Sequence, residues 1–265
     1  MEVDVLMVLY VLFGGVAAGS FWAAVVAEFR GVRRKICKRC YVAAFVSLVL
    51  AGVSIFMHLP HPENSIHIFS NLGSSWLSRE TLSMGRKLVG FLGAVAGLAN
   101  TVSTGMVYVV PAQPAWNTFL MPLMHVASAA VLGVFVFAAA SASSDLSDQS
   151  FRKVCKVAAI ALILQILIGA SYLRHLYRVP EVPVEELLHG GLSPFFWMRV
   201  ILGSLIPLIF IGVYLAKGER VISRKTLAVT CLLYVLASTF IETALIHWTS
   251  EPVSLFNPEE ILGGV

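Results

Sequence analysis

The sequence has few charged residues and little that belongs to a water-soluble domain. Asp, Glu, Lys and Arg make up only 13% of the 265 residues, and a soluble protein usually has about twice that share. The chain begins Met-Glu-Val-Asp and lacks the basic stretch and small-residue cleavage site of a signal peptide. We therefore expect the first apolar segment to remain in the mature protein and no separate soluble domain to be present.

Cysteines are also scarce, and their spacing excludes a disulfide framework. Cys37 and Cys40 form a single C-x-x-C in a basic stretch, while Cys155 and Cys231 lie in or beside apolar segments. A zinc or iron–sulfur site needs about four converging ligands. The sequence therefore predicts no metal site in this chain. The net charge of +4 comes from clustered loop residues and does not indicate nucleic-acid binding.

Apolar residues, in contrast, make up 58% of the chain and give it a mean hydropathy of +0.83. Apolar runs of about 20 residues mark membrane helices. They predict an all-α, polytopic transmembrane helix bundle that forms one integral membrane domain over residues 1–265. Seven spans are expected; an eighth stays open, because the tail after Trp248 is polar and short. The predicted spans are about Val5–Phe29, Tyr41–Leu59, Arg86–Val110, Phe119–Ala140, Val154–Leu173, Pro194–Ala216 and Thr226–Trp248.

The loops give a prediction of orientation. The first loop, Arg30–Arg39, has six basic residues and no acid, so the positive-inside rule places it in the cytoplasm. In a multi-pass protein of the cell membrane, the N-terminus and the loop from His58 to Glu80 then lie outside. The other loops disagree, because alternation through seven spans puts eight Lys and Arg residues inside and ten outside. We follow the first loop, because it is short, early and unmixed.

The stretch from His58 to Glu80 has the residue types of a proton-accepting site. His58 falls at the end of the second predicted span, and Glu80 follows Ser78, a residue type that caps helices. If the second and third spans form an antiparallel hairpin, His58 and Glu80 lie at one membrane face. A histidine and a carboxylate at that boundary suit the oxidation of a quinol, which releases protons. An interfacial ion pair, or two solvated loop residues, are the alternatives.

The run Ser75-Trp-Leu-Ser-Arg-Glu80 resembles the membrane anchor subunit of the dimethyl sulfoxide reductase type of molybdenum oxidoreductase. The histidine of that family's His-Leu-Gly pattern corresponds to His58, with Pro60 in place of the glycine. A basic residue that commonly follows the histidine is missing, and His61 stands nearby instead. The turn 108–117 is similar to the family's tyrosine–proline–tryptophan–asparagine turn.

The resemblance implies a subunit of anaerobic respiration that oxidises menaquinol and passes electrons to a partner iron–sulfur subunit, which supplies a molybdopterin catalytic subunit. The chain would not act on the terminal substrate and would hold no covalently bound cofactor. Iron–sulfur clusters and molybdopterin would lie only in the partner subunits; membrane lipid and the quinone would be further partners, and nucleic acid would not. The implied catalytic residues are His58 and Glu80, and the implied quinol-binding residues are His58, His61, Trp76, Ser78, Arg79, Glu80 and Tyr108.

Polar residues within the predicted spans need a reason, because they are costly in a membrane. Glu28, Arg199 and Glu242 are expected near the cytoplasmic ends of their spans, where Arg199 pairs with Glu242 or Glu28, or belongs to a proton path. His125 and His247 are candidate axial ligands of a b-type haem, so a membrane cytochrome subunit is the main alternative. A small-solute transporter is a further alternative, although the paired broken helices typical of transporters are missing.

Overall fold

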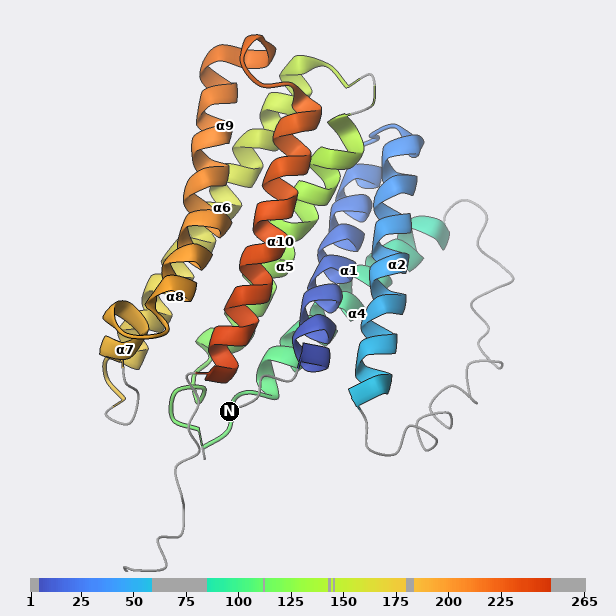
Figure 1. Cartoon of the computed structure of the whole chain (residues 1–265). Helices are drawn as coiled ribbons and strands as arrows, with labels where there is room; N and C mark the ends of the chain where they lie inside the picture. Colours follow the sequence, from blue (N-terminus) through green and yellow to red (C-terminus); the bar gives the residue numbers. More distant parts are fainter. Residues whose placement is uncertain are drawn as a thin grey trace, which may run out of the picture.

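The structure is a computed structural model that describes residues 5–58, 85–111, 113–142, 144, 146–179 and 184–248. Over these residues the chain forms helices joined by turns, with no strand. Seven helical stretches in the described ranges are long and apolar enough to cross a membrane. The prediction of an all-α polytopic bundle is therefore confirmed (Figure 1).

Most of the spans are single continuous helices close to their predicted positions. The sixth is composite, because a π-helical turn, η4, interrupts it between α8 and α9. The short helix α7 lies outside the spans, and η5 ends the sixth. The elements are α1 (Val5–Phe29), α2 (Arg34–His58), α4 (Gly85–Met106), α5 (Leu120–Ala142), α6 (Asp148–Leu176), α7 (Val184–His189), α8 (Ser193–Val200), η4 (Ile201–Leu205), α9 (Ile206–Lys217), η5 (Gly218–Arg220) and α10 (Arg224–Trp248).

The second span begins earlier than its predicted start at Tyr41. Helix α2 starts at Arg34, so most of the predicted basic loop is helical. The reason lies in the first two turns, where Ile36, Cys37 and Cys40 are buried against the bundle. The long aliphatic stems of Lys and Arg let a helix continue through the membrane boundary while the charged heads stay in water. The C-x-x-C thiols are thus packing residues, and neither forms a disulfide.

The third span runs opposite to its predicted direction. Trp22 of α1 donates a hydrogen bond to the carbonyl of Ala94 in α4 at 3.1 Å. A Cβ on Gly90 would lie 3.5 Å from Val25, near the end of α1. Thr104, at the other end of α4, lines a cavity together with Tyr10 near the start of α1. Helix α4 is therefore antiparallel to α1.

Helix α2 is also antiparallel to α1, because a tight turn at residues 30–33 joins the two. Helices α2 and α4 thus point the same way, and the predicted antiparallel hairpin of the second and third spans is wrong (Figure 1). His58 and Gly85 lie toward opposite ends of the bundle. The prediction failed because it took residues 59–84 for a loop that returns to the same face. Residues 59–84 lie outside the described part of the chain.

With α4 in this direction, the basic residues gather at one end of the bundle. We call it the basic end; it is formed by the turn 30–33, residues 146–147 and η5, and it is at the top in Figure 1. The Lys and Arg residues in these turns or in the flanking turns of helices account for 15 of the 19 in the chain. They are Arg30, Arg33, Arg34, Lys35, Lys38, Arg39, Arg86, Lys87, Arg152, Lys153, Lys156, Lys217, Arg220, Arg224 and Lys225.

Close packing of α1 on α5 organises the other helices. A Cβ on Gly19 would overlap the carbonyl of Ala129, and a Cβ on Gly133 would overlap the carbonyl of Gly19. Glycine at both positions lets the two backbones touch. The central core then extends from α5 over α6, α9 and α10, around the fully buried Phe151 and Tyr214.

Candidate functional site

We call the end opposite the basic end the Tyr108 end; it is formed by residues 107–119 and the last turns of α2, α6 and α10. Of the residues predicted to act on quinol, the structure describes His58 and Tyr108. His58 is the last residue of α2 and is exposed at this end. His61, Trp76, Ser78, Arg79 and Glu80 lie outside the described residues.

Tyr108 lies in the interior of the bundle, with 3% of its surface exposed. Its ring stacks on His125 at a centroid distance of 5.4 Å and meets Trp116 edge-on at 5.2 Å. Tyr108 therefore faces the inside of the bundle. The tyrosine turns inward because the Pro-rich turn that carries it is tied to helices on the far side of the bundle.

Three hydrogen bonds hold that turn in place. Trp116 donates from Nε1 to the carbonyl of Ile246 in α10 at 3.1 Å. Tyr172 of α6 donates from its hydroxyl to the carbonyl of Ala115 at 3.2 Å. His175 Nε2 lies 3.3 Å from the carbonyl oxygen of Pro114. The turn therefore links the ends of α6 and α10 and fixes Tyr108 against His125.

Burial controls the protonation of Tyr108. Loss of solvent, with a smaller contribution from the nearby Tyr10, raises the pKa of the Tyr108 phenol to about 12. The phenol keeps its proton at neutral pH, since the charged form would have to exist in an apolar surrounding. Tyr108 can therefore donate a hydrogen bond to a ligand but cannot act as the base that removes a proton.

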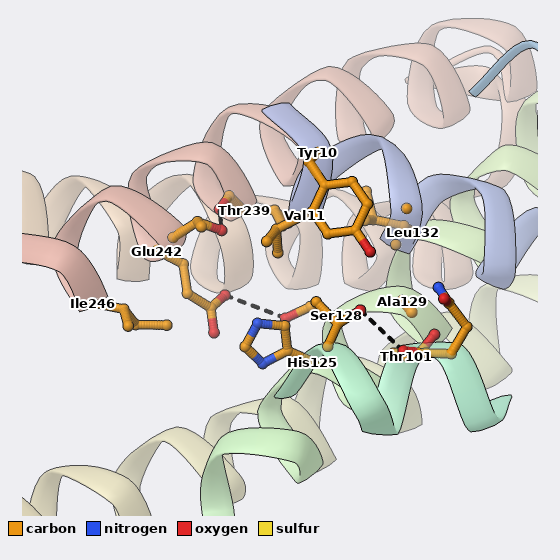
Figure 2. Close-up of a pocket in the computed structure, with 15 residues that line it drawn as sticks. Tyr10, Val11, Thr101, His125, Ser128, Ala129, Leu132, Thr239, Glu242 and Ile246 are labelled. Carbon is orange, nitrogen blue, oxygen red and sulfur yellow. Dashed lines mark hydrogen bonds between the residues drawn. The ribbon is translucent and has the colours of Figure 1, made fainter. Parts of the chain in front are cut away.

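A small polar cavity lies between α1, α4, α5 and α10 in the half of the bundle next to the Tyr108 end (Figure 2). Its volume of about 30 Å³ suits one or two water molecules, because a single water needs roughly 10–15 Å³ on this measure. Polar groups come from all four helices, which is unusual for the interior of an apolar bundle. Those labelled in Figure 2 are Tyr10, Thr101, His125, Ser128, Thr239 and Glu242.

The surroundings of His125 indicate which of its two ring nitrogens carries the hydrogen. Nδ1 lies 2.9 Å from the carbonyl oxygen of Met121, one turn earlier in α5. A carbonyl only accepts hydrogen bonds, so Nδ1 carries the hydrogen in this arrangement. Nε2 of a neutral ring is then the atom that can take up a proton. In Figure 2 the ring lies between Glu242 and the side of the cavity formed by α4 and α5.

Glu242 of α10 lies at the wall of the cavity and is the buried acid of the site, with 6% of its surface exposed. Its Oε1 is 2.9 Å from a guanidinium nitrogen of Arg199 in α8. Its Oε2 accepts a hydrogen bond from Ser128 at 3.2 Å, and Ser128 Oγ accepts one from Gln165 at 3.0 Å. Four helices thus contribute to one hydrogen-bonded cluster, and both carboxylate oxygens have a partner.

The π-helical turn η4 explains how Arg199 reaches the acid. Ser238 of α10 donates a hydrogen bond to the carbonyl of Arg199 at 2.9 Å, one helical turn before Glu242. A Cβ on Gly203, within η4, would overlap the Ser238 side chain. The irregular turn and the missing side chain let α8 approach α10 closely. Gly169 of α6 makes space on the other side, since its Cβ would lie 3.6 Å from the guanidinium.

One of the two predicted partners of Arg199 is confirmed and the other is wrong. Arg199 pairs with Glu242, but Glu28 lies at the basic end, where its carboxylate accepts a hydrogen bond from Tyr41 at 2.9 Å. The expectation that all three residues lie near the same ends of their spans is therefore wrong, because the Arg199–Glu242 pair lies toward the Tyr108 end. The sequence reasoning missed the role of α10 as a polar face. Three polar residues of α10 lie one, four and five positions after Ser238, a spacing that places all four on one side of the helix. They are Thr239, Glu242 and Thr243. That spacing was the available signal.

The described residues also bear on metal binding. They contain no group of three or more His, Cys, Asp or Glu side chains placed to hold a metal ion. His125, one of the two candidate haem ligands, has a ring nitrogen engaged by Met121. The side chain of the other, His247, lies outside what the structure describes.

Searches of the sequence against protein-family models and curated proteins, and of the structure against solved structures, find no match.

Proposed function

We propose that the chain is the membrane anchor subunit of a molybdenum oxidoreductase of the dimethyl sulfoxide reductase type, and that it oxidises menaquinol at its Tyr108 end. The terminal substrate is reduced elsewhere, in a molybdopterin subunit. Electrons leave this chain through a partner iron–sulfur subunit docked at the same end. The motif support is His58 at the end of the second span, together with the run from Ser75 to Glu80, which lies outside the described residues, so that its role stays a sequence-based prediction.

The observation that carries the proposal is the interior position of Tyr108. Tyr108 belongs to the residues that the resemblance associates with quinol, and it contacts His125 beside a polar cavity in an apolar bundle. Menaquinol has two hydroxyl groups that donate and accept hydrogen bonds. A phenol that stays protonated can donate to one quinol oxygen. The cavity is too small for the quinol ring, so the ring binds at its rim and protons enter the water-sized space.

The charge distribution supports an outward Tyr108 end. The positive-inside rule places the end with an excess of Lys and Arg in the cytoplasm. With α4 antiparallel to α1, the count of basic residues strongly favours the basic end, and the conflict between loops disappears. The N-terminus, the end of α2 and the Tyr108 turn are then all outside. Protons from quinol oxidation are released on that side.

The proposal is tested by purifying the tagged chain from its own membrane under mild conditions. We expect an iron–sulfur protein and a molybdopterin protein to co-purify in equal amounts. The complex should oxidise a reduced menaquinone analogue when an electron acceptor for the catalytic subunit is supplied. A chain that purifies without redox partners, and membranes in which it neither binds nor oxidises quinol, would contradict the proposal.

A further inference from the structure

Glu242 lies between two cavities, a position that a purely structural ion pair does not need. The first is the polar cavity next to His125. The second, of about 50 Å³, lies beneath α8, between α5, α6, α7, α8 and α10, where Tyr172 and Arg199 line it. Glu242 and Ile246 border both. A water molecule fits in either cavity, so the carboxylate can exchange a proton with water on two sides.

The Arg199–Glu242 ion pair is expected to add little to the stability of the fold. Removing two charges from water costs several kcal/mol per ion in proteins, and well-packed apolar residues of similar volume are often as stabilising. The cost is larger inside a bundle that is surrounded by lipid. Even so, η4, Gly203 and Ser238 adapt the packing of α8 on α10 to bring Arg199 to Glu242. Buried ionisable residues at such positions commonly belong to proton or ion pathways.

The chemistry of the neighbours identifies which groups can change protonation. Arg199 offers only hydrogen-bond donors, so it is not a candidate proton acceptor. Ser128 both donates to Glu242 and accepts from Gln165, so it can reorient but cannot hold a proton. The carboxylate of Glu242 and the ring of His125 remain as proton acceptors. The ionisable groups that line the two cavities are Tyr10 on α1, His125 on α5, Tyr172 on α6, Arg199 on α8 and Glu242 on α10.

We propose that Glu242 is the proton-relay residue of this chain: it takes a quinol proton from the cavity beside His125 and releases it into the cavity beneath α8. This inference rests on the proposed function. Oxidation of one menaquinol breaks two O–H bonds and gives menaquinone, two protons and two electrons. The electrons pass to the partner iron–sulfur subunit. One proton at a time converts the Glu242 carboxylate to a carboxylic acid, which weakens its attraction to Arg199 and lets it pass the proton to water in the second cavity, which Glu242 already borders.

The central test is Glu242→Gln in the assembled complex. The amide keeps the shape and the hydrogen bond to Ser128 but cannot accept the proton. Quinol oxidation should fall by about 10²-fold or more, the lower bound for losing a general base. The KM for quinol should stay within about twofold, because Glu242 does not touch the ring, and the pH profile of turnover should change shape. Activity from an artificial electron donor to the catalytic subunit should be unaffected.

Chemical rescue separates proton transfer from a structural role. In a Glu242→Ala complex, the space left by the side chain admits small weak acids. Formate or azide should then raise quinol oxidation at least several-fold, with no such effect on the wild-type complex. Glu219→Gln is the matched control: Glu219 also pairs with an arginine, Arg224, but at the basic end. That variant should keep wild-type turnover and pH profile.

The outcomes distinguish this inference from the proposed function. A wild-type complex without quinol oxidation overturns both. An active wild type with an assembled Glu242→Gln complex of unchanged rate and pH profile overturns the relay alone. If neither Glu242 variant assembles, the redox-induced infrared difference spectrum of the wild-type complex decides. The relay requires a glutamic acid carbonyl band that shifts on ¹³C labelling of glutamate, and its absence overturns the relay.

Discussion

The two ends of the bundle handle charge in opposite ways. At the basic end, charges are numerous and partly exposed: Asp148, about half exposed, accepts hydrogen bonds from Arg152 at 2.9 Å and from Tyr214 at 2.7 Å. At the Tyr108 end, the described part of the chain places one ion pair, Arg199–Glu242, inside the bundle beside a cavity. Solvated pairs contribute little to stability individually and serve to set orientation. An enclosed pair is costly and indicates chemistry.

The largest expected difference between the two ends is in their reaction with a reagent that stays outside the cell, and it should be all-or-none. In a background without native cysteines, Asn117→Cys in the Tyr108 turn should react with an impermeant thiol reagent in intact cells. Arg220→Cys in η5 should react only after lysis, because the basic end faces the cytoplasm. Both positions are exposed. The opposite labelling pattern would reverse the orientation, and it is the pattern that simple alternation through the seven predicted spans requires.

Tyr108→Ala should give the next largest effect, on stability. Truncation of a buried aromatic side chain typically costs about 3–5 kcal/mol. Here it also removes the stack on His125 and the contact with Trp116. Tyr108→Phe keeps the ring and loses only the hydroxyl, so it should keep thermal stability. Its KM for quinol should rise by up to about tenfold, the equivalent of one lost hydrogen bond. Equal melting temperatures for the two variants would show that the ring does not stabilise this end.

Gly203→Ala and Gly212→Ala form a matched pair on the sixth span. An added Cβ at Gly203 would overlap Ser238, whereas none lies within 4 Å of one at Gly212. Overpacking should destabilise the Gly203 variant by about 1–3 kcal/mol. The Gly212 variant should be neutral or more stable, since alanine favours helix by up to about 1 kcal/mol over glycine. Thermal unfolding in detergent measures both; a stable Gly203→Ala would remove the argument for close approach at η4.

The smallest effect is expected for Glu219→Gln at the basic end. Its carboxylate pairs with Arg224 but is half exposed, so the loss should stay below about 1 kcal/mol. A thermal shift assay of the purified chain measures it. A large loss would show that the ion pairs of the basic end stabilise the fold as well as orient it.

The sequence predicted the spans better than their directions. Hydropathy located all the described spanning helices, because apolar length is a direct requirement of the bilayer. Hydropathy could not predict that α4 runs parallel to α2, because the hydropathy of a segment is the same whichever way the helix crosses the membrane. An ion pair of Arg199 with Glu242 or Glu28 was predicted from the cost of buried charge. Which of the two acids is the partner depends on which helix ends lie at the same end of the bundle, and the sequence does not give that. The inward turn of Tyr108 depends on hydrogen bonds from α6 and α10, which no local pattern reveals.

The central claim, that this chain oxidises quinol at its Tyr108 end, is tested most directly by His58→Ala in the assembled complex. His58 is exposed at this end, and the substitution removes an imidazole, a side chain that can accept a proton. Menaquinol oxidation should fall by about 10²–10⁴-fold, and artificial-donor activity at the catalytic subunit should survive. Normal quinol-dependent turnover in a fully assembled His58→Ala complex would contradict the account.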